Sequence, residues 1–159
     1  MSNTLVAYFS ASGVTARLAK TFAAVTGGDL YEIRPAVPYT EADLNWNNKQ
    51  SRSSVEMNDP AARPEIAVPV TDMAQYDTVF VGFPIWWYEA PRIIETFLES
   101  YDFSGKTVVP FATSGGSGMG ETERILQKSC PAATVLAGRR LSGSASESTV
   151  SDWVKSLGL

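Results

Sequence analysis

The sequence predicts an α/β fold in which a parallel sheet of five strands is doubly wound, with helices on both of its faces. Apolar runs rich in β-branched and aromatic residues alternate along the chain with segments of helical periodicity. Each parallel crossover needs a connection long enough to hold a helix, which explains the alternation. The 159 residues, of which 44% are hydrophobic, are enough for one core. We therefore predict a single domain spanning residues 1–159.

The expected strands are short segments with strand-type composition. They cover residues 4–9, 29–33, 78–83, 106–112 and 133–139, and the pattern is weakest at 29–33. Two helices are indicated by apolar residues at helical spacing: Ile93, Ile94, Phe97 and Leu98 in one, and Val150, Trp153, Val154 and Leu157 in the other. Further helices are expected after residue 15 and over residues 121–128.

Residues 35–70 interrupt this rhythm, because the segment is polar and contains five prolines, at positions 35, 38, 60, 64 and 69. Residues 41–55 have the composition of a polar helix, although no clean apolar stripe marks one face. We interpret the whole segment as an elaborated second crossover that covers one edge of the sheet, and not as a second domain.

Composition excludes several classes of function. The 17 acidic and 13 basic residues give a net charge of −4 without any basic run, so nucleic acid is not an expected partner. No run reaches the roughly 20 apolar residues of a membrane span, and no signal segment is evident, which predicts a cytoplasmic protein. Cys130 is the only cysteine and histidine is absent, so we expect no disulfide, no metal site and no catalytic side chain. A bound cofactor would have to supply any chemistry.

Ligands of an open parallel sheet bind outside the carboxyl ends of its strands. The first loop at that edge, residues 10–15, places the hydroxyls of Ser10, Ser12 and Thr15 around Gly13, directly before a helix. Free N–H groups and the helix dipole favour an anion there, so the loop predicts a site for a phosphate monoester. The alternative is that these hydroxyls only cap the helix, but a cap needs fewer of them.

The other two loops suggest a flat ring. Trp86, Trp87 and Tyr88 follow one another after the third strand, as expected of a stacking platform, although one Trp could instead pack into the core. The glycine-rich loop of residues 113–121 lets backbone amides approach the edge of a heterocycle, and its alternative interpretation is a flexible turn. Neither glycine run has the spacing of a nucleoside triphosphate or dinucleotide signature.

Together the three loops describe a site for flavin mononucleotide (FMN). The first loop resembles the Ser/Thr-x-Ser/Thr-Gly-x-Thr phosphate loop of flavodoxins, and "GFPIWW" followed by "PFATSGGSGMG" resembles a bacterial flavodoxin-like branch with a Trp pair. The resemblance implies a flavodoxin-like sheet and three groups of cofactor-binding residues. They are Ser10, Ser12, Gly13, Val14 and Thr15 for the phosphate, Pro84, Ile85, Trp86 and Trp87 beside the ring, and Thr113, Ser114, Gly115 and Gly116 at the ring edges. Branch members often have Gly where this chain has Tyr88.

The resemblance implies electron transfer between redox partner proteins, with FMN as the redox group. The alternative of the same fold is an NAD(P)H-dependent FMN-containing quinone reductase, and a net charge of only −4 weakens the carrier interpretation somewhat. A flavin-free interaction module is a third class, which would make all three loops coincidental. We also expect the carboxylates of Glu89 and Glu121 to lie in the acidic surroundings of the ring.

Overall fold

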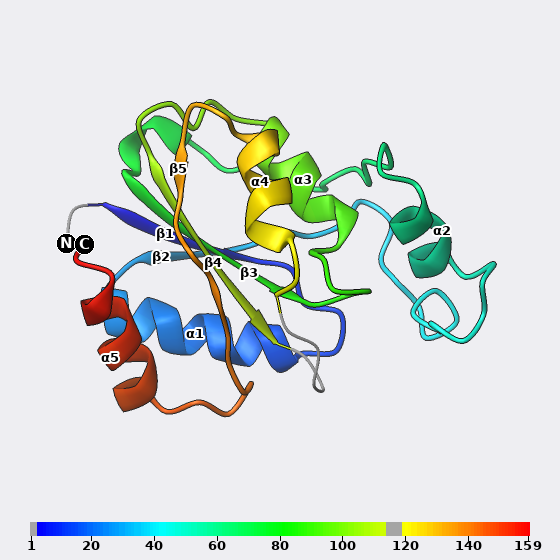
Figure 1. The fold of residues 1–159 in the computed structure, drawn as a ribbon, viewed down its shortest axis with the longest axis horizontal. Helices are drawn as coiled ribbons and strands as arrows, with labels where there is room; N and C mark the ends of the chain where they lie inside the picture. Colours follow the sequence, from blue (N-terminus) through cyan, green and yellow to red (C-terminus); the bar gives the residue numbers. More distant parts are fainter. Residues whose placement is uncertain (1–2, 114–118) are drawn as a thin grey trace.

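The computed structural model describes residues 3–113 and 119–159. Its parallel sheet has the strand order β2-β1-β3-β4-β5, with one further short strand, β6, paired with β4 (Figure 1). The strands are β1 (Thr4–Tyr8), β2 (Asp29–Glu32), β3 (Thr78–Pro84), β4 (Thr107–Thr113), β5 (Thr134–Val135) and β6 (Arg139–Arg140). The doubly wound parallel fold that the sequence predicts is therefore confirmed.

Helices cover both faces of this sheet. Helices α1 (Val14–Thr26) and α5 (Glu147–Ser156) lie on one face, and α3 (Arg92–Glu99) and α4 (Thr122–Ser129) lie on the other (Figure 1). A short helix, α2 (Arg52–Asn58), lies beyond the carboxyl ends of the strands, and a 3₁₀ turn (Met73–Gln75) precedes β3. This arrangement leaves the carboxyl edge of the sheet to the loops.

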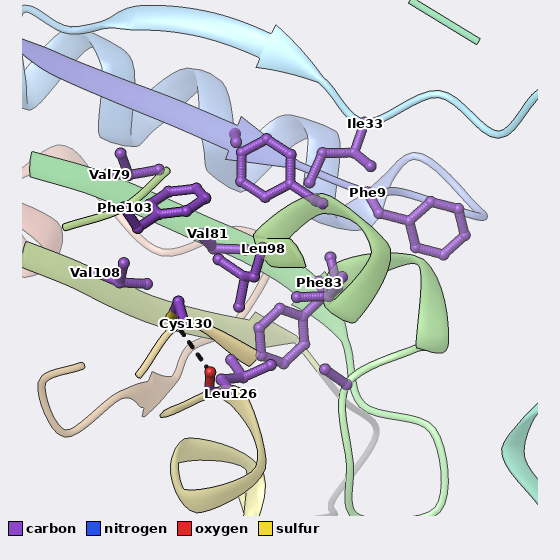
Figure 2. Packing of buried hydrophobic residues seen from close by; sticks show 14 of the residues in the cluster. Phe9, Ile33, Val79, Val81, Phe83, Leu98, Phe103, Val108, Leu126 and Cys130 are labelled. Carbon is purple, nitrogen blue, oxygen red and sulfur yellow. Dashed lines mark hydrogen bonds between the residues drawn. The ribbon is translucent and has the colours of Figure 1, made fainter. Parts of the chain in front are cut away.

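Two apolar layers hold the helices to the sheet. Figure 2 shows the layer beneath α3 and α4, where Val81, Phe83 and Val108 of the strands meet Leu98 and Leu126 of the helices. The second layer joins the sheet to α1 and α5 and includes a stacked Phe22–Phe111 ring pair, with centroids 4.0 Å apart. Because both faces are covered, β1 and nearly all of β3 and β4 are buried, which is why their sequences are continuous apolar runs.

The fifth strand differs from its prediction. The expected strand at 133–139 consists of two short pieces, β5 and β6, which both pair with β4. Pro110 of β4 faces the break between them, and its carbonyl oxygen would lie 2.7 Å from a Cβ at Gly138. Proline has no N–H to donate, so the ladder is interrupted beside it and resumes when the Leu141 N–H donates to the Ala112 carbonyl.

The long segment between β2 and β3 agrees with the predicted crossover only in part. Residues 35 and 66 form an antiparallel bridge that extends the β2 edge. The prediction of a polar helix over residues 41–55 is wrong. The helix in this segment is Arg52–Asn58, and turns precede it. The side chains of Asn45 and Asn48 accept hydrogen bonds from backbone N–H groups two residues on, at 3.1 and 2.9 Å, and such local bonds compete with helix formation.

Candidate functional site

A cavity of about 590 Å³ opens at the carboxyl edge of the sheet. Its walls come from the segment after β1, from the end of β3 and the residues that follow it, from the last residue of β4, and from β6 with the residues that follow it. The lining residues are Ser12, Val14, Pro84, Ile85, Trp86, Thr113, Arg140, Leu141, Ser142 and Gly143. The cavity falls within the size range of small-molecule and cofactor sites, and hydroxyl groups and apolar side chains share its wall.

The first loop owes its shape to its own backbone. Gly13 has a φ of 91°, a left-handed conformation that favours glycine, and its N–H donates to the Ser10 hydroxyl oxygen at 3.1 Å. Gly13 is the N-cap of α1 and forms no side-chain capping hydrogen bond. The N–H groups of the first helical turn have no intrahelical acceptor, because helix geometry provides none there. The loop therefore presents backbone donors and the positive end of the helix dipole at the cavity.

One hydroxyl of this loop fastens it to the sheet. Thr15 is 2% exposed, and its hydroxyl is hydrogen-bonded to that of Thr113, at the end of β4, over 2.8 Å. Ser12, in contrast, is exposed and lines the cavity. The hydroxyls that the sequence groups together thus have different roles, with Ser10 shaping the loop, Thr15 anchoring it and Ser12 lining the cavity.

The aromatic residues of the second loop form a two-residue turn. The N–H of Trp86 donates to the Glu89 carbonyl at 2.9 Å, and the N–H of Glu89 donates to the Trp86 carbonyl at 3.1 Å. The two central residues, Trp87 and Tyr88, have φ angles of 51° and 64°, as in a type I′ turn. Such a conformation costs roughly 1–2 kcal/mol at a residue other than glycine. Contacts from elsewhere in the fold must offset that cost.

Aromatic packing supplies one set of these contacts. Trp86 is half-buried and meets Phe9 and Tyr39 edge to face, with centroid distances of 5.7 and 5.6 Å. Tyr39 belongs to the long crossover, so this segment reaches the candidate site as well as the edge of the sheet. Trp87 is 44% exposed. Trp86 thus packs partly against the core and also lines the cavity, so which Trp stacks on a ring stays a prediction.

A buried arginine supplies the second set. Arg92 is 4% exposed and donates to the carboxylates of Glu89 at 2.9 Å and Glu95 at 3.0 Å, and to the Met57 carbonyl at 2.8 Å. It therefore ties the turn to α2 and α3. Burial raises the pKa of the Glu95 carboxyl above its ordinary value, while hydrogen bonding to Arg92 and the charge of Arg63 act in the opposite direction.

The two acidic residues expected near a ring do not line the cavity. Glu89 is paired with Arg92, as described above, and Glu121 is paired with Arg124 over 2.6 Å. Each negative charge is thus balanced by a neighbouring cation. The structure gives no support to an acidic wall on the described side of the cavity.

The structure brings together six of the residues that the sequence nominates. Ser12, Val14, Pro84, Ile85, Trp86 and Thr113 line the cavity. Ser10, Gly13 and Thr15 shape or anchor the first loop, and Trp87 lies exposed on the turn. Ser114, Gly115 and Gly116 lie outside the described residues.

Sequence reasoning missed the part of the wall formed by residues 140–143. The loops that the sequence nominates for this edge are those after the first, third and fourth strands. The fifth strand of a parallel sheet ends at the same edge, so the loop after it also borders the ligand-binding edge. The local signal is the small polar run Ser142, Gly143 and Ser144 after that strand.

Two structural findings limit other classes of site. Within residues 3–113 and 119–159, no three His, Cys, Asp or Glu side chains are grouped so that they could hold a metal ion. In the same residues no helix is long and apolar enough to cross a membrane.

The doubly wound sheet with a cavity at its carboxyl edge defines a flavodoxin-like protein, and the comparison with protein families agrees. The model of the family described as flavodoxin matches residues 3–157. The chain belongs to the flavodoxin family, and the resemblance predicted from its loops is thereby confirmed.

Solved structures similar to this chain include two from Bacteroides, each described as a candidate flavoprotein. The protein from B. eggerthii DSM 20697 is 53% identical, with a TM-score of 0.95 over 100% of this chain and 99% of the other. The protein from B. uniformis ATCC 8492 is 54% identical, with a TM-score of 0.92 over 97% of this chain and 98% of the other. These likenesses place the chain among flavodoxin-like flavoproteins.

Two more distant relatives carry more specific names. A flavoprotein in complex with FMN from Lactobacillus acidophilus NCFM is 22% identical, with a TM-score of 0.74 over 97% of this chain and 99% of the other, and this likeness shows the fold. An Escherichia coli K12 protein named uncharacterized NAD(P)H oxidoreductase YcaK is 29% identical over 77 residues, 47% of this chain. The matched part spans only 34% of that protein's length.

Proposed function

We propose that this protein binds FMN in the cavity at the carboxyl edge of its sheet and transfers electrons between redox partner proteins. One observation carries the proposal. Ser12 and Val14 of the first loop, Trp86 of the aromatic turn and Thr113 at the end of β4 line the same cavity. The chain's membership of the flavodoxin family and the FMN named in the L. acidophilus complex support the choice of cofactor.

The residues present fit the phosphate end of FMN. A Cβ at Gly13 would meet no other atom within 4 Å, so open space lies beside the uncapped start of α1. A phosphate monoester carries a charge of about −1.5 to −2 at pH 7, and helix N-terminal N–H groups bind such anions. The cavity lining among the described residues contains no Asp or Glu that would repel it.

The ring end of FMN needs an apolar wall, and Pro84, Ile85 and Trp86 provide one. Trp86 is held by Phe9 and Tyr39, so its ring is fixed before any ligand binds. When bound, FMN supplies the redox chemistry, because it exchanges electrons singly or in pairs. The chain binds the cofactor, orients it and limits its contact with water. In keeping with its composition, we also propose that it acts in the cytoplasm.

A second candidate function is an NAD(P)H-dependent reductase of quinones or similar acceptors. The local similarity to the E. coli NAD(P)H oxidoreductase favours it. The match covers about half of this chain, and only the name of the E. coli protein favours the reductase over the carrier. The two functions differ in whether a nicotinamide reduces the flavin directly.

The test is anaerobic mixing of the FMN-loaded protein with NADPH and, separately, with NADH. A carrier has no site for the nicotinamide, so its flavin absorbance should bleach slowly or not at all. A stepwise reductive titration with dithionite, as the control, should resolve two separate one-electron steps. Fast bleaching that saturates with NADPH or NADH, together with a single two-electron step, would replace the carrier with the reductase.

A further inference from the structure

Arg140 is the one charged residue among the described residues that line the cavity. The other lining residues are apolar or carry neutral hydroxyl groups. The chain as a whole has a net charge of −4, so the approach of an anion is opposed unless a local cation offsets it. A single arginine in such a wall therefore has a large influence on which ligands bind.

The backbone that carries Arg140 is held on two sides. Arg140 is in register with Ala112 of β4, and the next N–H, of Leu141, donates to the Ala112 carbonyl at 2.8 Å. Further on, Gly143 lies against Val14 so closely that a Cβ there would clash with the Val14 Cγ1 atom. Residues 140–143 therefore run from beside the end of β4 to the first turn of α1, next to the predicted phosphate loop.

The guanidinium of Arg140 is also free of competing carboxylates. Among the described residues no Asp or Glu oxygen lies within 4.0 Å of it, whereas Arg52, Arg63 and Arg92 are each paired with a glutamate. A side chain already committed to an ion pair would have to release its partner before it could bind a ligand. Arg140 does not have this cost.

We propose that Arg140 binds the phosphate of FMN and makes the cavity select phosphorylated flavin over riboflavin. This inference rests on the proposed function. A guanidinium can donate two parallel hydrogen bonds to phosphate oxygens, and it stays charged at any physiological pH. The N–H groups of α1 and the Arg140 side chain would then hold the phosphate from two separate segments of the chain. The flavin ring would then be bound by the apolar wall of the cavity.

The experiment compares Arg140→Gln with Arg139→Gln, because Arg139 is exposed on the same short strand but does not line the cavity. Dissociation constants for FMN and for riboflavin are measured by quenching of flavin fluorescence at low and high salt. Loss of a charge-assisted bond should weaken FMN binding by Arg140→Gln about tenfold or more. Riboflavin binding should change less than about twofold, because riboflavin lacks the phosphate that the bond involves.

Arg139→Gln should bind both flavins as the unmodified protein does, and Arg140→Lys should keep part of the preference for FMN. The salt dependence of FMN binding should also decrease in Arg140→Gln, because one ionic contact is gone. An unchanged ratio of FMN to riboflavin affinity in Arg140→Gln, or an equal loss for both flavins, would overturn the inference while the proposed function stands. If the unmodified protein binds neither flavin, the proposed function fails and this inference fails with it.

Discussion

The first loop and the aromatic turn border the same cavity, yet they are built in opposite ways. Residues 10–15 are small, and one glycine adopts a conformation that glycine accepts at little cost. Residues 86–89 place Trp87 and Tyr88 in conformations that such residues disfavour, and the turn needs Phe9, Tyr39 and Arg92 to hold it. The first loop thus takes its shape mainly from local sequence, with one distant hydrogen bond from Thr15 to Thr113, whereas the turn is held by several contacts from distant parts of the chain.

The largest effect is expected from Gly13→Asp, with Gly13→Asn as the matched control. Both side chains are nearly the same size and tolerate a positive φ, so they differ mainly in charge. A carboxylate beside the phosphate should weaken FMN binding roughly 100-fold relative to the Asn variant, about 3 kcal/mol of like-charge repulsion at a partly buried site. Titration of each variant with FMN and with riboflavin measures the difference.

Riboflavin should bind the Asp and Asn variants equally, because it carries no phosphate. If FMN also binds the two variants equally, the phosphate does not lie at the first loop. The assignment of the first loop as the phosphate-binding part of the cavity would then be wrong.

Breaking the support of the aromatic turn should give the next largest effect. Arg92→Met removes the cation between Glu89 and Glu95 and leaves the Met57 carbonyl without its donor. Loss of one partner of a buried pair should lower the free energy of unfolding by about 3 kcal/mol. Urea unfolding of the apo-protein measures it, with Arg124→Met as the control, since the exposed Arg124–Glu121 pair should contribute less than about 1 kcal/mol.

The same variant separates the two regions in binding experiments. A displaced turn should weaken FMN and riboflavin binding to the same extent, because the phosphate loop is unaffected. A selective loss of FMN binding in Arg92→Met would contradict the division of the cavity into a phosphate end and a ring end.

The two tryptophans should differ in what they stabilise. Trp86→Ala removes a half-buried ring from Phe9 and Tyr39 and should cost about 2 kcal/mol of stability, whereas Trp87→Ala should cost less than about 1 kcal/mol. Both variants should weaken FMN and riboflavin alike, since neither residue lies in the phosphate loop. Equal costs in urea unfolding would mean that Trp86 is not the ring that braces the turn.

The smallest effect isolates the strain at the tip of the turn. Trp87→Gly should be more stable than Trp87→Ala by roughly 1 kcal/mol, because glycine accepts a φ of 51° and alanine does not. This order is opposite to the usual one, since glycine destabilises most positions relative to alanine. Thermal unfolding of the two variants compares them directly, and the usual order would show that the turn stores no strain.

The contrast between the two loops also explains how much the sequence could predict. The strands at 4–9, 78–83 and 106–112 were each placed within one residue at either end, because burial on both faces leaves a continuous apolar signal. The first loop was recognisable for a similar reason, since its glycine and hydroxyls are adjacent in the sequence. The break in the fifth strand depends on Pro110 of a neighbouring strand and could not be read locally.

Two residues of the candidate site escaped prediction for physical reasons. Arginine is usually exposed, and nothing near Arg92 in the sequence indicates that the end of α2 covers it. Arg140 is the second residue of β6, a strand of two exposed arginines that carries no apolar signal of its own. Both are long side chains whose role depends on which distant segment meets them, as in the aromatic turn.

The central claim is that the cavity between these two regions holds FMN. The most direct test is to purify the protein, denature it and determine the mass of the flavin that is released. The account predicts a yellow protein that releases FMN, with no adenylate attached. Release of FAD, or the absence of any flavin even after incubation of the purified protein with FMN, would contradict it.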